Sequence, residues 1–139
     1  MTNNRKFCEW KPEMSVGSEE LDYQHKHLVE LINQVYHAHS LGNQRKVIGP
    51  ILDKLAIYTS YHFSFEEVYF ELFNYPEKTE HIKEHDEFRK MINEFTSQYK
   101  SRKSDVTPEL LNFLKEWLRH HVLGSDRRYI DCFTKNGVK

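Results

Sequence analysis

The chain has 139 residues, of which 20 are Lys or Arg and 21 are Asp or Glu, so its net charge is -1 with neutral histidines. This balance does not suit binding to nucleic acid or to an anionic membrane surface, and no apolar run approaches the roughly 18 residues of a membrane span. The N-terminal segment lacks the apolar core of a signal peptide, so we expect a cytoplasmic protein in which Cys8 and Cys132 are free thiols.

An irregular arm and two long helices are predicted for the first half of the chain. The arm covers residues 1–17 and carries three apolar side chains that we expect to pack onto the helices: Phe7, Trp10 and Val16. From 18 to 41 and from 44 to 73, apolar residues recur every three or four positions, which is the pattern of a helix with one buried face. Gly42 and Asn74 suit the left-handed residue that ends each helix.

The second half predicts two further long helices and a short C-terminal one. The third helix is expected from 77 to 100, and a polar turn, "SRKSD", follows it. Thr107 can cap the fourth helix, with Pro108 at the first helical position, where proline is best tolerated. Gly124 should interrupt this helix, and "DRRYIDCF" should form the short final one.

The predicted fold is all-α. A chain of this length corresponds to a single domain over residues 1–139, with residues 1–17 as its N-terminal arm. The connections between successive helices are short, so neighbouring helices should be antiparallel. We therefore expect an up-down-up-down four-helix bundle with an N-terminal arm and a short C-terminal helix.

Ionisable residues interrupt the apolar stripes of all four helices, although burying them without partners costs several kcal/mol. These residues are His25, His62, Glu66, His81, His85 and His121. Two pairs are four residues apart, which places both members on the same side of a helix. Any one histidine is well explained as a hydrogen-bonded core residue. The coincidence on four helices instead indicates that a pair of divalent metal ions lies between them.

Asp126 is the candidate for a second carboxylate ligand. It follows His121 by five residues, which on a straight helix would rotate it about 140° away from the site. A break at Gly124, with Ser125 as a possible new cap, could return it to the core. Asp126 is thus either a ligand or a cap residue of the final helix, and the site's shortage of negative charge favours the ligand.

Other polar residues near the stripes are expected to lie outside the site. His27, His37 and His120 fall off the stripes and should face solvent, while His39 lies near the end of the first stripe. Asp22 and Glu67 are adjacent to candidate ligands. They are either surface charges or hydrogen-bond partners of the ligands, and we expect surface charges.

The number and type of ligands favour iron. Five imidazoles and two carboxylates are too many for one tetrahedral zinc ion, and calcium or magnesium would prefer oxygen. Two octahedral first-row ions fit, with iron first and manganese second. Oxygenase-type di-iron bundles use Glu-x-x-His motifs, which are absent from these inward faces. Fewer anionic ligands should favour binding of dioxygen over its activation.

Five segments resemble the hemerythrin-like domain family in its single-domain bacterial form (bacteriohemerythrin). They are "EWKPEMSVG", "DYQHK", "HFSFEE", "YPEKTEHIKEH" and "WLRHHVLGSD". The resemblance implies the four-helix bundle, for which myohemerythrin is a reference case. It also implies two iron ions with an oxo or hydroxo bridge. By this resemblance, His81, His85 and His121 bind one iron and His25 and His62 the other, with Glu66 and Asp126 bridging.

The resemblance further implies that dioxygen binds at an open position on the second iron, in an apolar pocket. Our candidates for this pocket are Leu28, Phe63, Trp117 and Leu118. The chain departs from the family where Phe70 replaces a frequent Met and Asn74 a frequent Gly, and neither is expected to touch a ligand. Phe70 could instead alter the pocket volume.

The implied function is reversible oxygen binding for carriage, storage or scavenging, without enzymatic turnover. Two alternatives remain open. One is an oxygen or redox sensor that signals through a separate protein partner, and the other is a di-iron enzyme acting on peroxide or nitric oxide.

Overall fold

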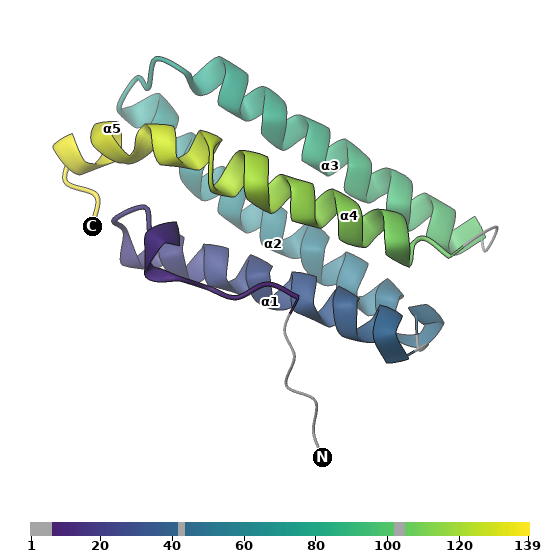
Figure 1. Cartoon of the computed structure of the whole chain (residues 1–139). Helices are drawn as coiled ribbons and strands as arrows, with labels where there is room; N and C mark the ends of the chain where they lie inside the picture. Colours follow the sequence, from purple (N-terminus) through teal and green to yellow (C-terminus); the bar gives the residue numbers. More distant parts are fainter. Residues whose placement is uncertain (1–6, 42–43, 102–104) are drawn as a thin grey trace.

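The long helices run in alternating directions, and the C-terminal segment continues beyond the last of them (Figure 1). The computed structural model describes residues 7–41, 44–101 and 105–139, and within these ranges every regular element is helical. The long helices are α1 (Glu19–Leu41), α2 (Gln44–Leu72), α3 (Lys78–Ser101) and α4 (Thr107–Trp117). The predicted up-down-up-down bundle is therefore confirmed.

The ends of the first three helices lie within one residue of their predicted positions. Asn74 follows α2 with a φ of 50°, the left-handed conformation predicted for it. Gly42 and most of the polar "SRKSD" turn lie outside the described residues. Periodicity located these helices well because each one buries a single continuous stripe.

The start of α4 differs from the prediction. Thr107 is the first helical residue and the preceding Val106 occupies the cap position, without a side-chain hydrogen bond to the helix. The Thr107 amide instead donates to Oδ1 of Asp105 at 3.0 Å. The predicted cap was therefore wrong by one position, although Pro108 does lie in the first turn, where its missing N–H leaves no helical bond unmade.

The described part of the N-terminal arm, residues 7–17, packs onto α1, as predicted. The Phe7 ring stacks on Tyr36 with centroids 5.1 Å apart, and the Phe7 amide donates to Asn33 Oδ1 at 2.8 Å. The Val16 amide and the Ser15 hydroxyl both donate to the carboxylate of Asp22. The expectation that Asp22 is a surface charge was therefore wrong, because this half-buried carboxylate holds the arm on the bundle.

The buried apolar residues form two clusters. The larger cluster occupies most of the bundle and includes Leu28, Phe63 and Leu118. The smaller cluster lies under the C-terminal segment and consists of Val16, Leu21, Phe70, Tyr75, Tyr129 and Phe133. Burial of each such side chain contributes about 1.5–3 kcal/mol. The buried ionisable residues lie between the two clusters along the helices, so apolar packing holds them from both sides.

After α4 the chain changes helical type twice, through η2 (Leu118–Val122), a π-helical turn, and η3 (Ser125–Tyr129), a 3-10 turn, before α5 (Ile130–Lys135). The amide of Leu123 bonds to the carbonyl of Leu118, five residues back, at 3.0 Å. A Cβ on Gly124 would lie 2.4 Å from the carbonyl oxygen of His120, so glycine is required at this close approach. The break at Gly124 is confirmed, whereas the wide turn before it was not predicted.

Two further expectations concern the chain as a whole. Within the described residues, no helix is both long enough and apolar enough to span a membrane. Cys8 and Cys132 are both free thiols, as predicted.

Candidate metal centre

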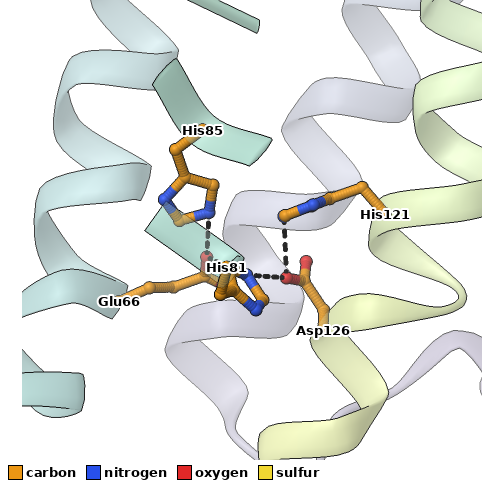
Figure 2. A group of neighbouring side chains, drawn as sticks. All are labelled: Glu66, His81, His85, His121 and Asp126. Atoms are coloured by element: carbon orange, nitrogen blue, oxygen red, sulfur yellow. Dashed lines mark ion pairs between the residues drawn. The ribbon is translucent and has the colours of Figure 1, made fainter. Parts of the chain in front are cut away.

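The structure brings the seven predicted ligands together in the middle of the bundle. They come from α1, α2, α3, η2 and η3, and each is at most 3% exposed: His25, His62, Glu66, His81, His85, His121 and Asp126. Figure 2 shows five of them, with three imidazoles surrounding the two carboxylates. Asp126 thus lies in the site rather than capping the final helix, and Ser125 also serves no cap, because Gly124 precedes η3.

The ligand atoms fall into two overlapping groups, in each of which all atoms lie within 4.8 Å of one another. The larger group combines three histidines with both carboxylates: His81, His85, His121, Glu66 and Asp126. The smaller group combines two histidines with the same carboxylates: His25, His62, Glu66 and Asp126. We call these the five-ligand half and the four-ligand half. Sharing of both carboxylates is the arrangement that would let them bridge two cations.

Glu66 divides its two oxygens between the halves. Its Oε1 lies 3.1 Å from Nε2 of His85 and 3.6 Å from Nε2 of His81, both in the five-ligand half. Its Oε2 lies 3.5 Å from Nε2 of His62 and 3.9 Å from Nε2 of His25, in the four-ligand half. One carboxylate therefore faces both groups of imidazoles.

Asp126 does the same from the other side of the bundle. Its Oδ1 lies 2.8 Å from Nε2 of His81 and 3.0 Å from Nε2 of His121. Its Oδ2 lies 3.0 Å from Nε2 of His25. The wide η2 turn and the break at Gly124 make this possible, because they bring Asp126 back to the same side as His121.

Without a metal ion, protons compensate the buried charge. Burial by itself would lower the pKa of His81 and His121, but their contacts with the carboxylates outweigh it and raise these pKa values to about 10 and about 8. Burial lowers the pKa of His62 to about 4. Burial also opposes ionisation of Glu66 and Asp126, yet the surrounding histidines hold the pKa of both carboxyl groups well below the usual range. The site thus favours positive charge between its carboxylates.

The atoms that face the centre lack hydrogen-bond partners that meet normal geometry among the described residues. They include Nε2 of His25, His81, His85 and His121, Oε1 of Glu66 and both oxygens of Asp126. Buried polar groups are normally satisfied, so such a cluster of unsatisfied donors and acceptors needs an explanation. Imidazole nitrogens and carboxylate oxygens suit first-row transition metals, and the site can therefore bind metal.

Three of the histidines are oriented through Nδ1 by polar side chains of other helices. Nδ1 of His85 lies 2.7 Å from Oε2 of Glu67, a carboxylate that Arg89 also contacts at 3.2 Å. The expectation that Glu67 is a surface charge was therefore wrong. Hydrogen bonds of this kind fix the tautomer and the direction of a metal-binding imidazole.

The other two partners were missed in the sequence. Nδ1 of His62 lies 2.5 Å from Oε1 of Gln24, and Nδ1 of His121 lies 2.7 Å from Oε1 of Glu84. Glu84 is itself held by the Ser125 hydroxyl, which donates to it at 2.7 Å. Each partner adjoins a candidate ligand in sequence but bonds to a histidine of a different helix. Adjacency to the motifs was the available signal, and only the packing shows which histidine each one contacts.

Tyr129 is a further polar contact that the sequence reading missed. Its hydroxyl donates to Oε2 of Glu66 at 2.6 Å, and its ring is fully buried in the smaller apolar cluster. The bond crosses from η3 to α2, so Tyr129 holds Glu66 in the direction that faces both halves.

Aromatic rings cover the imidazoles on the outside of the centre. Phe63 stacks on His85 with centroids 3.8 Å apart, and Trp117 stacks on His121 at 3.9 Å. Leu28, Phe63 and Leu118 are buried in the larger apolar cluster, against which Trp117 packs. These four residues, the proposed pocket, therefore lie on one side of the centre.

Phe70 lies on the opposite side, in the smaller cluster, and its ring centroid is 4.7 Å from that of His81. The expectation that Phe70 touches no candidate ligand was therefore wrong, and it lies away from the predicted oxygen pocket. Asn74 is exposed after the end of α2.

The remaining histidines lie outside both groups. His27, His39 and His120 are exposed, and His120 pairs at 2.9 Å with Glu116, four residues earlier in α4. His37 is only half-exposed and contacts the ring of Tyr36, so it faces solvent less fully than predicted.

Comparison with known proteins agrees with the conclusion that this site can bind metal. The family model described as the hemerythrin HHE cation binding domain matches residues 16–132. A bacteriohemerythrin of Clostridium acetobutylicum is 34% identical over 88% of this chain and 98% of its own length. A bacteriohemerythrin of Stenotrophomonas maltophilia is 31% identical over 88% of this chain and 78% of its own length. A wild-type hemerythrin structure superposes with a TM-score of 0.84 at 26% identity, covering 92% of this chain and 98% of that one. The chain belongs to the hemerythrin family.

Proposed function

We propose that this protein is a non-haem di-iron protein that binds dioxygen reversibly, for carriage, storage or scavenging of oxygen. The observation that carries the proposal is the division of both carboxylates between two groups of imidazoles. Iron fits the mixture of nitrogen and oxygen ligands. The iron pair, with its oxo or hydroxo bridge, would supply electrons when dioxygen binds and take them back when it is released.

The two halves differ in a way that favours ligand binding at one of them. An octahedral ion has six positions, and a bridging solvent oxygen would occupy one at each ion. The five-ligand half would then be complete. The four-ligand half, around His25 and His62, would retain one open position. We therefore assign oxygen binding to the four-ligand half.

The chain's own apolar residues on this side of the centre would restrict this position to small ligands. Leu28 and Phe63 are each 1% exposed and Leu118 is 6% exposed. Together with Trp117 they would exclude bulk water from the centre, which slows oxidation of the iron and loss of the bound ligand. Gln24 and Glu67 would hold two imidazoles in fixed orientations through Nδ1.

The proposal is tested by metal analysis and by spectra recorded on the same sample without oxygen and then in air. About two irons per chain, with a fast, stoichiometric spectral change that reverses on removal of oxygen, would support it. Replacement of His62 or Glu66 by Ala should remove one or both irons. A wild-type protein that holds a single zinc ion would refute the di-iron assignment.

The same samples separate the other functions implied for this centre. Turnover of peroxide or nitric oxide well above that of free iron would make the protein an enzyme rather than a carrier. A protein partner captured only by the deoxygenated or only by the oxidised form would indicate a sensor. Absence of both, together with reversible oxygen binding, is the result that we expect.

A further inference from the structure

One buried hydroxyl near the centre has no predicted ligand role and no hydrogen-bond partner in the part of the chain that the structure describes. The hydroxyl of Tyr58 makes no hydrogen bond among the described residues, and its side chain is only 6% exposed. An unsatisfied buried hydroxyl destabilises a fold. The predicted ligands account for the other unsatisfied atoms except Nδ1 of His25 and the Thr107 hydroxyl at the far end of α4. Metal binding would therefore leave Tyr58 as the unsatisfied hydroxyl beside the site.

Tyr58 lies against the four-ligand half. It precedes His62 by one turn of α2, and the two rings stack with centroids 5.2 Å apart and planes 13° apart. Burial first, and then the negative charges of Glu66 and Asp126, raise the pKa of Tyr58 well above its ordinary value. The phenol therefore keeps its proton and remains a hydrogen-bond donor beside His62.

The side of the centre on which Tyr58 lies is the apolar one. Its ring belongs to the larger cluster, with Leu28, Phe63 and Leu118. Tyr129 lies in the smaller cluster, and its hydroxyl is already used by Glu66. The Tyr129 hydroxyl is therefore engaged, whereas the Tyr58 hydroxyl, unbonded among the described residues, is available to a ligand that enters the proposed oxygen pocket.

A pocket of about 270 Å³ between α1 and α2 reaches Tyr58 from the surface. Its lining includes exposed side chains, such as Tyr23 and Ile57, and also Gln24 and Tyr58. Gln24 bonds to Nδ1 of His62 and Tyr58 stacks on the same ring. The floor of this pocket is thus formed by the two residues that contact His62 from outside the centre.

We propose that the Tyr58 hydroxyl donates a hydrogen bond to a small, electron-rich ligand held at the four-ligand half. This inference rests on the proposed function and extends it, because it names the ligand class as dioxygen and small anions such as azide. Binding to reduced iron places negative charge on dioxygen, and a hydrogen bond to a charged acceptor is stronger than one to a neutral acceptor. In an apolar pocket such a donor favours binding and slows release.

The test compares Tyr58→Phe with wild type in the full-length, iron-loaded protein. Removal of one charge-assisted hydrogen bond should weaken azide binding to the oxidised protein about tenfold and speed dioxygen release about tenfold. Iron content should stay unchanged at about two per chain. Tyr61→Phe is the matched control, because this exposed tyrosine lies three residues away and its hydroxyl donates to Glu20. It should leave both constants within about twofold.

A second measurement uses the metal-free protein, where no ligand is present. Because the hydroxyl bonds to none of the described residues, Tyr58→Phe should keep or raise the melting temperature, by up to about 4 °C. A fall of several degrees would show that the hydroxyl has a structural partner, and unchanged azide affinity and oxygen release would show that it donates to neither ligand. Either result overturns the inference. If wild type and Tyr61→Phe bind neither ligand, the proposed function fails as well.

Discussion

Gly124→Ala is the substitution that most directly tests how the fold places the second carboxylate. An alanine Cβ at this position would lie 2.4 Å from the carbonyl oxygen of His120 and 3.2 Å from its carbonyl carbon. Real Cβ atoms essentially never approach closer than 3.0 Å, so the backbone must separate by at least about 0.6 Å. The atoms in contact belong to the main chain, and no side-chain rotation can relieve the clash.

The magnitude follows from this displacement. Overpacking costs about 1–3 kcal/mol, and a main-chain clash should lie near the upper end. For a chain of this size that lowers the melting temperature by about 6–12 °C. Metal sites tolerate errors of only about 0.5 Å. Gly124 lies between His121 and Asp126 in sequence, and Nε2 of His121 lies 3.0 Å from Oδ1 of Asp126. A shift of the backbone between them should therefore also lower metal affinity.

Thermal unfolding and iron content of Gly124→Ala would be measured beside wild type and Gly137→Ala. Gly137 has a φ of +83° and no atom near the added Cβ, so alanine there strains only the terminal backbone. The control should lose about 1 kcal/mol and keep both irons. If Gly124→Ala melts within 2 °C of wild type and holds two irons as tightly, our explanation of how Asp126 reaches the centre is wrong.

Three further predictions concern the contacts around the centre. Glu67→Gln should weaken metal binding about 10- to 100-fold in a chelator competition, because its carboxylate orients His85; equal affinity would contradict that role. Tyr129→Phe should destabilise the metal-free protein by about 2 kcal/mol in denaturant unfolding, because Glu66 loses a 2.6 Å hydrogen bond, and an unchanged midpoint would argue against it. Metal loading at pH 7 should release about two protons, because the raised pKa values of His81 and His121 keep both imidazoles protonated at that pH. Metal affinity should therefore rise between pH 6 and 9. Calorimetry in buffers of different ionisation enthalpy would count these protons, and loading without proton release would refute the charge assignment.

The sequence was sufficient to predict the fold and to place six of the seven ionisable residues on the inward-facing sides of their helices. Helical periodicity depends only on local spacing, and a residue four positions from another lies on the same side of the helix. His62 with Glu66, and His81 with His85, could therefore be assigned to the core from their spacing alone. The burial of such residues on four helices then required a compensating charge.

Asp126 shows where local spacing stopped being informative. The sequence indicated a break at Gly124 but left the direction of the following segment open. The structure settles that direction by a π-helical turn, Leu118–Val122, which adds a residue to the helical turn ahead of the break. Such a turn depends on how α4 packs at its end, and no local propensity predicts it.

The hydrogen bonds to the histidines were likewise decided by the tertiary structure alone. Gln24, Glu67 and Glu84 each adjoin a candidate ligand, yet each contacts a histidine on another helix, 18 to 38 residues away in sequence. Helix periodicity specifies which side of its own helix a residue occupies. Which neighbour that side meets depends on the axial offset and rotation between packed helices, and those are determined by the apolar clusters on both sides of the centre.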